Sequence, residues 1–542
     1  MRSSQIARGS VRTVAVFLTA TFLGCQPATE EISLDQALDE SEIEGFLEHM
    51  AGLSSDEMAG RRPGTAGFDS AAAYVIREAR ALGLEPGGAD GSYEQPIPFR
   101  RATVEAGSAT FSVGDAALVF GPDFSLSPRI LRAATDLSAP LVFAGFGISA
   151  PDLGYDDFAE IDVEGKLVVV LRGAPDSFGS LESTVLSASK VRDTELRTRG
   201  AIGVVVVQPD GDRLTSRART GFVVPGADSD EVMLREELSA TLVVPERIAA
   251  RWMAGVGRSL EEVHASLRDG TPQSFDLSAD GRVTARFTHE TFESSNVAAL
   301  LPGSDPDLRA EHLVVTAHLD HLGIGTALDG DSIYNGTLDN ASGSAAILTL
   351  ASMLTRLEAP RRSILFLWVT AEESGMLGSE YFARFPTVDG QVVANQNIDG
   401  VMGMIAAATD ALAFGYEHSN LSEAVDFAVA RTGTPVSPDP TPDQNLFIRS
   451  DQYAFVRQGI PAIWVQAGRS SLDPAIDAQG ELDRWIVERY HKPTDDGVQP
   501  IDMDGVRYEL WNNLLVTWHI ANEMDEVRWD TSSFLYGLRP GG

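Results

Sequence analysis

Residues that can bind a metal follow several apolar, strand-like runs in the second half of the sequence. Three runs end in this way: 313–317 before His318, 363–370 before Glu372 and Glu373, and 392–398 before Asp399. A turn at residues 335–343 contributes Asp339, and His491 lies in a polar loop further along the chain. Because ligands bind beyond the carboxyl ends of parallel strands in open α/β sheets, we expect these side chains to converge.

Imidazole and carboxylate side chains such as these suit zinc, and a catalytic zinc keeps one position open for water. Cys25 is the only cysteine, so histidine and carboxylates must hold any metal. Asp320, two residues after His318, can accept the second ring N–H of that ligand. Glu372 and Glu373 point in different directions, so one can bind metal while the other acts as a general base. Two histidine and three carboxylate ligands exceed the needs of one zinc and suit a two-metal site.

The surrounding pattern predicts an α/β domain interrupted by a β-rich insert. Residues 32–84 have mostly helical spacing, with a loop rich in glycine and proline at 60–67. Residues 102–287 consist of short β-type runs separated by turns. After residue 294, strands and helices alternate as in an α/β sheet.

Composition and motifs exclude other classes of function. The 542 residues carry a net charge of −36, which would repel a nucleic-acid backbone, so we exclude nucleic-acid binding. The run 145–150 has the glycines of a dinucleotide site, but turn residues at 151–154 follow it where that site needs a helix. The sequence contains no Gly-x-Ser-x-Gly motif, which argues against an α/β serine hydrolase.

Residues 1–24 predict a secretion signal, with a basic start and an apolar run at 14–23 that is too short for a stable membrane anchor. The run leads into Phe22-Leu23-Gly24-Cys25, which resembles a bacterial lipobox apart from the residues at 22 and 23. Cys25 would then carry the lipid, and that lipid would be the only contact with a membrane. The alternative is an ordinary cleaved signal with an incidental cysteine. In either case we expect an exported protein, either a cell-envelope lipoprotein or a secreted one.

The motifs with metal-binding residues resemble, in order and spacing, those of the di-zinc aminopeptidases related to the secreted Streptomyces and Vibrio enzymes. The matching segments are 317–323, 335–343, 370–375, 397–399 and 490–491. The resemblance implies a zinc-exopeptidase fold (phosphorylase/hydrolase-like), a three-layer α/β/α arrangement around a mixed sheet, and two Zn²⁺ ions. It also implies a role for each residue: His318 and Asp399 on one zinc, Glu373 and His491 on the other, Asp339 bridging both, Glu372 as general base and Asp320 as the partner of a ligand.

Two further resemblances define the expected domains. Residues 145–171 and 199–203 are similar to the protease-associated (PA) insert of many such peptidases, and residues 60–64 and 74–84 are similar to their N-terminal part. The expected boundaries are a signal at 1–24, a lipidated tether at 25–35, the first part of the peptidase domain at 36–125, a PA-type insert at 126–285, the di-zinc peptidase domain at 286–530 and a tail at 531–542.

Two positions depart from the family pattern. Leu338 precedes the bridging aspartate where relatives often have an acidic or polar residue, and Gly400 follows a ligand where they have a bulky one. Neither change removes a ligand, but Gly400 would reshape the substrate pocket. We interpret His321 as a pocket-lining residue and assign Asp451 no direct contact with metal.

The resemblance implies a zinc-dependent aminopeptidase that removes N-terminal residues from peptides by metal-activated water, with Glu372 as the base. One alternative is a carboxypeptidase-type exopeptidase acting on acidic peptides, for which Arg449, Arg457 and Arg469 are candidate cationic groups. A second is a non-catalytic, receptor-like binding protein of the same fold. A single-zinc enzyme similar to glutaminyl cyclase is a third. The expected partners are peptide substrates.

Overall fold

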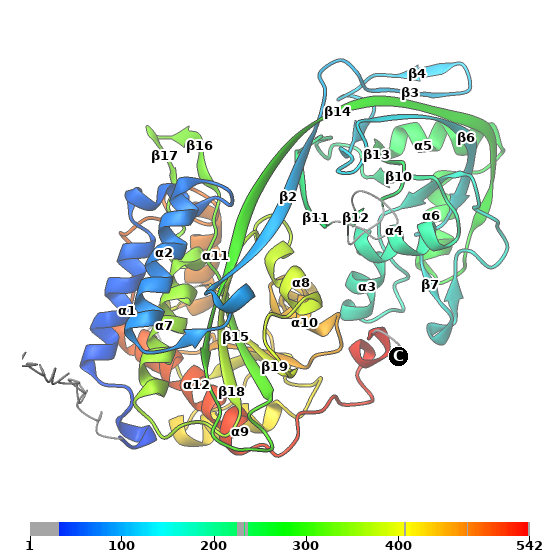
Figure 1. Cartoon of the computed structure of the whole chain (residues 1–542). Helices are drawn as coiled ribbons and strands as arrows, with labels where there is room; N and C mark the ends of the chain where they lie inside the picture. Colours follow the sequence, from blue (N-terminus) through cyan, green and yellow to red (C-terminus); the bar gives the residue numbers. More distant parts are fainter. Residues whose placement is uncertain are drawn as a thin grey trace, which may run out of the picture.

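The computed structural model describes residues 32–539, except 225–231, 234–236, 401, 406–407 and 474. The predicted signal and Cys25 therefore lie outside the described residues. Two sheets organise the rest of the chain, and the long strand β14 (Ser274–Leu301) belongs to both (Figure 1). None of the helices in the described part is long and apolar enough to cross a membrane.

The first sheet is mixed, with four parallel strands at its centre. Its order is β11-β2-β14-β18-β15-β19-β21-β20, in which β18, β15, β19 and β21 are parallel and the remaining neighbours are antiparallel. The bounds are β11 (Arg219–Val224), β2 (Glu94–Val104), β18 (Ser363–Val369), β15 (Glu311–His318), β19 (Gln391–Asn397), β21 (Ala462–Ala467) and β20 (Ala411–Phe414). The short strand β1 (Glu85–Pro86) also pairs with β14.

Helices cover both faces of this sheet. One layer contains α1 (Glu40–Leu53), α2 (Ala66–Ala81), α7 (Ser342–Thr355), α9 (Ser422–Thr432) and α12 (Met503–Asn522). The other contains α8 (Leu377–Arg384) and α10 (Gln452–Val456). Leu313 and Val315 of β15 pack into the first layer, whereas Val314 packs against Phe382 and Phe455 in the second. The predicted three-layer α/β/α fold with a mixed sheet is therefore confirmed.

The second sheet forms the insert. Its order is β4-β3-β14-β6-β9-β10-β13-β5. The bounds are β3 (Thr110–Val113), β4 (Ala116–Leu118), β5 (Ser125–Leu126), β6 (Ala134–Ala144), β9 (Leu167–Leu171), β10 (Gly203–Gln208) and β13 (Ala240–Pro245). β3 and β4 precede residue 126, where we expected the insert to begin, and yet pair within its sheet. β14 leaves this sheet after Arg286 and joins the first at Phe287.

The insert also contains helices that the strand-like pattern of its sequence did not predict. These are α3 (Ser180–Ser187), α4 (Ser189–Thr198), α5 (Glu246–Gly255) and α6 (Leu260–Arg268). α3 lies against the peptidase part, where Val185 packs in one cluster with Phe414 and Trp464 (Figure 1). The insert also contains the short strands β7 (Ser149–Ala150) and β8 (Tyr155–Asp156), and β12 (Val232–Met233) pairs with β11. The peptidase part further contains the hairpin β16 (Gly323–Leu328) and β17 (Asp331–Tyr334) and the helix α11 (Ala478–Glu488).

Candidate metal centre

The candidate ligands converge beyond the carboxyl ends of the parallel strands. His318 is the last residue of β15, Glu373 follows β18 by four residues, and Asp399 follows β19 by two. Asp339 lies in a short, irregular helical turn, η5 (Thr337–Ala341), that leads into α7. His491 enters from the loop after α11. The structure thus brings together all five residues that the sequence proposed as metal ligands.

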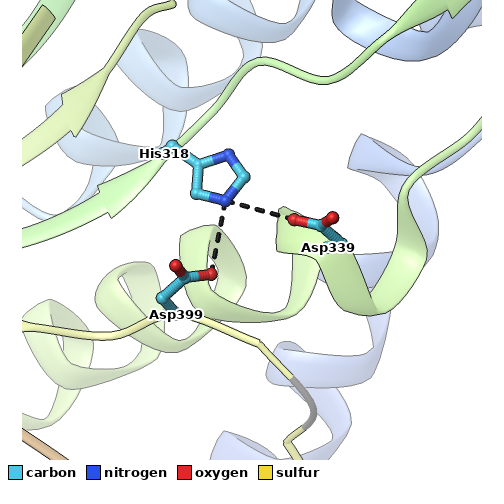
Figure 2. A group of neighbouring side chains, drawn as sticks. All are labelled: His318, Asp339 and Asp399. Carbon is cyan, nitrogen blue, oxygen red and sulfur yellow. Dashed lines mark ion pairs between the residues drawn. The ribbon is translucent and has the colours of Figure 1, made fainter. Parts of the chain in front are cut away.

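These side chains form two groups that share Asp339. His318 Nε2 lies 3.2 Å from Asp339 Oδ1 and 3.3 Å from Asp399 Oδ1 (Figure 2). On the other side, His491 Nε2 lies 3.2 Å from Asp339 Oδ2 and 3.1 Å from Glu373 Oε2. Tetrahedral zinc with bonds near 2.0–2.1 Å has ligand atoms about 3.3 Å apart, so both groups have suitable spacing. Each oxygen of Asp339 faces one group, as a bridging ligand requires.

The environment of these groups fits a cation. Asp339 Oδ2 and Glu373 Oε1 are buried and lie against imidazole nitrogens, His491 Nε2 at 3.2 Å and His321 Nδ1 at 2.8 Å, but neither contact is a well-directed hydrogen bond. Buried polar atoms are nearly always satisfied, so these oxygens need a partner. Burial lowers the pKa of His491, but the carboxylates of Asp339 and Glu373 outweigh it and raise that pKa to about 10. The centre therefore attracts positive charge strongly, and its donors are of the kind that bind zinc.

Glu372 stands beside the ligands without joining either group. Its side chain lines the adjoining cavity together with His318, Asp339 and Asp399. Burial raises the pKa of the Glu372 carboxyl well above its ordinary value; the His318 ring opposes this shift and Asp451 adds to it. A carboxylate with a raised pKa is suited to accept a proton near neutral pH.

Asp320 has a different contact from the one we expected. The sequence suggested that its carboxylate accepts the second ring N–H of His318. Instead, the backbone oxygen of Asp320 lies 3.1 Å from His318 Nδ1, and the Asp320 carboxylate accepts the backbone N–H of Glu372 at 3.0 Å. The chain turns immediately after β15, which brings the carbonyl to the ring and leaves the side chain to fix the Glu372 backbone.

His321 lies deeper than its expected pocket-lining position. Its ring is fully buried, with Nδ1 2.8 Å from Glu373 Oε1 and 3.9 Å from Asp339 Oδ2. His321 therefore lies beside the second group. It contacts Oε1 of Glu373, whereas His491 contacts Oε2 of the same carboxylate. The sequence signal for this contact is only the spacing of three residues between His318 and His321.

Two further residues support the centre and were not assigned roles from the sequence. Ser450 Oγ donates to Asp399 Oδ2 at 2.5 Å and accepts from Asn397 Nδ2 at 2.9 Å. Asp495 accepts the backbone N–H groups of Leu338 and Asp339, both at 3.1 Å. Ser450 and Asp495 lie in segments that the sequence marks as polar. The sequence does not show which atoms of the chain they bind.

Asp451, which we gave no direct contact with metal, accepts a hydrogen bond from Ser379 Oγ at 2.6 Å. The ion-pair and hydrogen-bond contacts of the described residues do not link its carboxylate to any of the five candidate ligands. This arrangement agrees with our expectation that Asp451 makes no direct contact with metal.

A cavity of about 290 Å³ adjoins the metal centre. Its walls are mixed. An apolar part is formed by Leu412, Phe414, Leu446, Trp464, Leu482, Trp485 and Ile486, and polar groups are added by Asp439, Thr441, Gln444, Gln466, Gln479 and Asp483. Gly400, Arg449 and Arg469 also line it, whereas Arg457 is paired with buried Glu380 at 3.2 Å. The centre thus stands at the wall of a site large enough for a side chain and the adjoining backbone of a peptide.

Comparisons with known proteins agree with this site. Residues 296–509, which include all five candidate ligands, match the model of peptidase family M28. Leupeptin-inactivating enzyme 1 of Streptomyces exfoliatus is 27% identical over 241 residues, which are 41% of this chain and 50% of that protein. The chain thus spans about half the length of this curated relative. The family resemblance seen in the sequence is confirmed.

Solved structures with a similar course of the chain include two bacterial aminopeptidases. The aminopeptidase from Aneurinibacillus sp. strain AM-1 is 18% identical, with a TM-score of 0.49 and coverage of 91% of this chain and 97% of that one. The zinc aminopeptidase from Bacillus subtilis is 16% identical, with a TM-score of 0.43 and coverage of 89% and 95%.

Proposed function

With a segment that matches peptidase family M28 as the premise, we propose that the protein is a zinc-dependent aminopeptidase that holds two Zn²⁺ ions. The observation that carries the proposal is the pair of histidine and carboxylate groups sharing Asp339. His321 and His491 both lie against Glu373 in the second group, and Glu372 stands beside the groups at the wall of a cavity. His318 and Asp399 would hold one ion, Glu373 and His491 the other, and Asp339 both. When bound, the ions lower the pKa of a water molecule and polarise the scissile carbonyl.

Glu372 is the general base of this proposal. Its carboxylate takes a proton from the attacking water and gives it to the leaving amine, which restores the carboxylate for the next cycle. Asp320 supports this role because it holds the Glu372 backbone N–H at 3.0 Å. The carboxylates around the centre favour a cationic group, which suits the free α-amine of a peptide N-terminus.

A carboxypeptidase-type exopeptidase on acidic peptides is the second candidate. Arg449 and Arg469 line the cavity, so two of the three proposed cations are placed where they could meet a substrate carboxylate. Arg457 is not, because it binds Glu380 at 3.2 Å. Arg469 already donates to the backbone oxygens of Ala467 and Gly468 at 2.9 and 3.3 Å, which reduces its capacity for substrate.

The substrate panel that tests the proposal compares amino-acid p-nitroanilides with N-blocked dipeptides that have a free C-terminus, each assayed with the zinc-loaded protein. We expect hydrolysis of the p-nitroanilides, with a preference for apolar residues that fit the cavity walls. Hydrolysis of the blocked dipeptides alone would support the carboxypeptidase. A protein that binds two zinc ions per chain and cleaves neither set would be the non-catalytic, receptor-like module.

We also propose that the protein is exported, that residues 126–285 belong to a PA-type insert, and that Cys25 carries a lipid. Export and lipidation are supported by the sequence of residues 1–25 alone. Expression with radiolabelled palmitate tests them, with Cys25→Ser as the control. Label in the wild type and not in the variant is the expected result, and an unlabelled wild type would refute lipidation.

A further inference from the structure

Arg61 is a fully buried cation that the proposed mechanism does not use. It lies in the loop Gly60-Arg-Arg-Pro-Gly64, more than 250 residues before the candidate ligands, and its exposed fraction is 0%. Burial lowers its pKa, but only to about 10, so the guanidinium remains charged at neutral pH. A buried charge is expensive unless hydrogen bonds compensate it, so its contacts indicate what it is for.

The guanidinium binds four backbone carbonyls from three separate parts of the chain. Nε donates to Leu319 O at 2.7 Å. Nη1 donates to Leu53 O at 2.7 Å and to Asn335 O at 2.5 Å. Nη2 donates to Gly336 O at 2.8 Å. Arginine alone offers such a planar fork of donors, and lysine cannot reproduce it.

Two of these parts carry candidate metal ligands. Leu319 directly follows His318, and Gly336 lies three residues before Asp339. The backbone oxygen of Arg61 also accepts the N–H of His321 at 3.3 Å. One side chain thus ties together the turn after β15 and the turn before α7, and anchors both to the end of α1.

The loop that carries Arg61 is shaped for this position. Gly60 and Arg61 both have positive φ, at 66° and 48°. A Cβ atom at Gly60 would lie 2.4 Å from Tyr334 O and 2.7 Å from Gly323 O, so only glycine allows the loop to approach this closely. The positive φ at Arg61 is backbone strain, which persists only where the surrounding contacts enforce it.

We propose that Arg61 is a positioning residue of the metal centre, which holds the turns bearing His318 and Asp339 in their ligand-binding arrangement before any metal binds. The proposal rests on the proposed function for the identity of the metal. Its structural part, that Arg61 orders the two turns, applies to the metal-free protein as well.

Arg61→Met removes the donors and the charge, and Arg61→Lys retains the charge with fewer donors in the wrong geometry. Arg362→Met is the matched control, because Arg362 is also fully buried and donates to the backbone oxygens of Ile520, Met524 and Asp525. Arg362 also pairs with Glu311 at 2.7 Å, and none of these partners is a candidate ligand. A purely structural buried arginine would behave as Arg362 does. If Arg61→Met does not fold, Arg61→Lys serves in its place.

The first measurement is hydrogen–deuterium exchange of the metal-free proteins. We expect amides in 319–321 and 336–341 to exchange at least about tenfold faster in the Arg61 variant than in the wild type, and not in Arg362→Met. The second is the zinc Kd by chelator competition, which we expect to weaken by about 10- to 100-fold in the Arg61 variant alone.

Unchanged exchange in both turns, or an equal effect of Arg362→Met on exchange and on zinc Kd, would overturn the proposal. A wild type that binds no zinc would instead refute the proposed function. The exchange comparison would then still decide whether Arg61 orders the turns.

Discussion

Removal of the Ser450 hydroxyl tests how the centre would hold a metal at the group that contains His318 and Asp399. Ser450 Oγ donates to Asp399 Oδ2 at 2.5 Å, leaving Asp399 Oδ1 facing His318. Hydrogen bonds to charged groups contribute about 1.5–3 kcal/mol, and every 1.4 kcal/mol is a factor of ten. Ser450→Ala should therefore weaken zinc binding by about 10- to 100-fold at the group that contains Asp399, because its carboxylate can then rotate away.

The assay is a competition titration with a chelator, in which the two zinc ions are resolved as a tighter and a weaker step. In Ser450→Ala, only one of the two steps should shift to weaker zinc binding. Ser379→Ala is the matched control, because Ser379 Oγ donates to Asp451 Oδ1 at a similar 2.6 Å and Asp451 is not among the candidate ligands. If Ser450→Ala and Ser379→Ala both bind zinc within twofold of the wild type, the hydroxyl does not orient Asp399 and the reasoning fails.

Three other changes have distinct expected results. Glu372→Gln should keep both zinc ions, by metal analysis, and lower kcat by about 10²- to 10⁴-fold, because the amide cannot accept the water proton; wild-type turnover would disprove the base. His321→Ala should weaken zinc at the group containing Glu373 and leave the other group unchanged, by the same titration; equal loss at both groups would contradict the contact. Asn445→Ala removes three hydrogen bonds to Ser180 and Thr184 of α3, at 3.3, 2.9 and 2.8 Å. It should raise KM about 3- to 10-fold with little change in kcat, and an unchanged KM would show that α3 does not support the cavity wall.

Three of the five candidate metal ligands, His318, Glu373 and Asp399, were predictable because each comes at or just after the end of a strand-like run in the sequence. A buried parallel strand is a continuous apolar run, and the first polar side chains after it stand at the sheet edge. β18 is buried along its whole length, and Glu372 and Glu373 follow it closely. The same reasoning correctly placed His318 and Asp399 together although 81 positions separate them.

The contacts that orient the ligands were not predictable from the same pattern. Asp320 has the right spacing to serve His318, but the direction of its carboxylate depends on the turn that follows β15. Arg61 binds backbone carbonyls up to 275 residues away, and a carbonyl acceptor leaves no mark on the side-chain sequence. The helices α3 and α4 are only eight and ten residues long, too short for a helical period to stand out among the strand-like runs of the insert.

The continuity of β14 has a mechanical consequence. Its 28 residues correspond to roughly 90 Å of extended chain at about 3.3 Å per residue, and its pairing passes from β6 to β2 between Arg286 and Phe287. Figure 1 shows β14 running from one sheet into the other. An insert joined by loops would swing on a hinge, whereas this one is joined by a paired ribbon that resists bending. Load applied to the insert would therefore be transmitted along β14 to its neighbour β18, at whose end Glu372 and Glu373 stand.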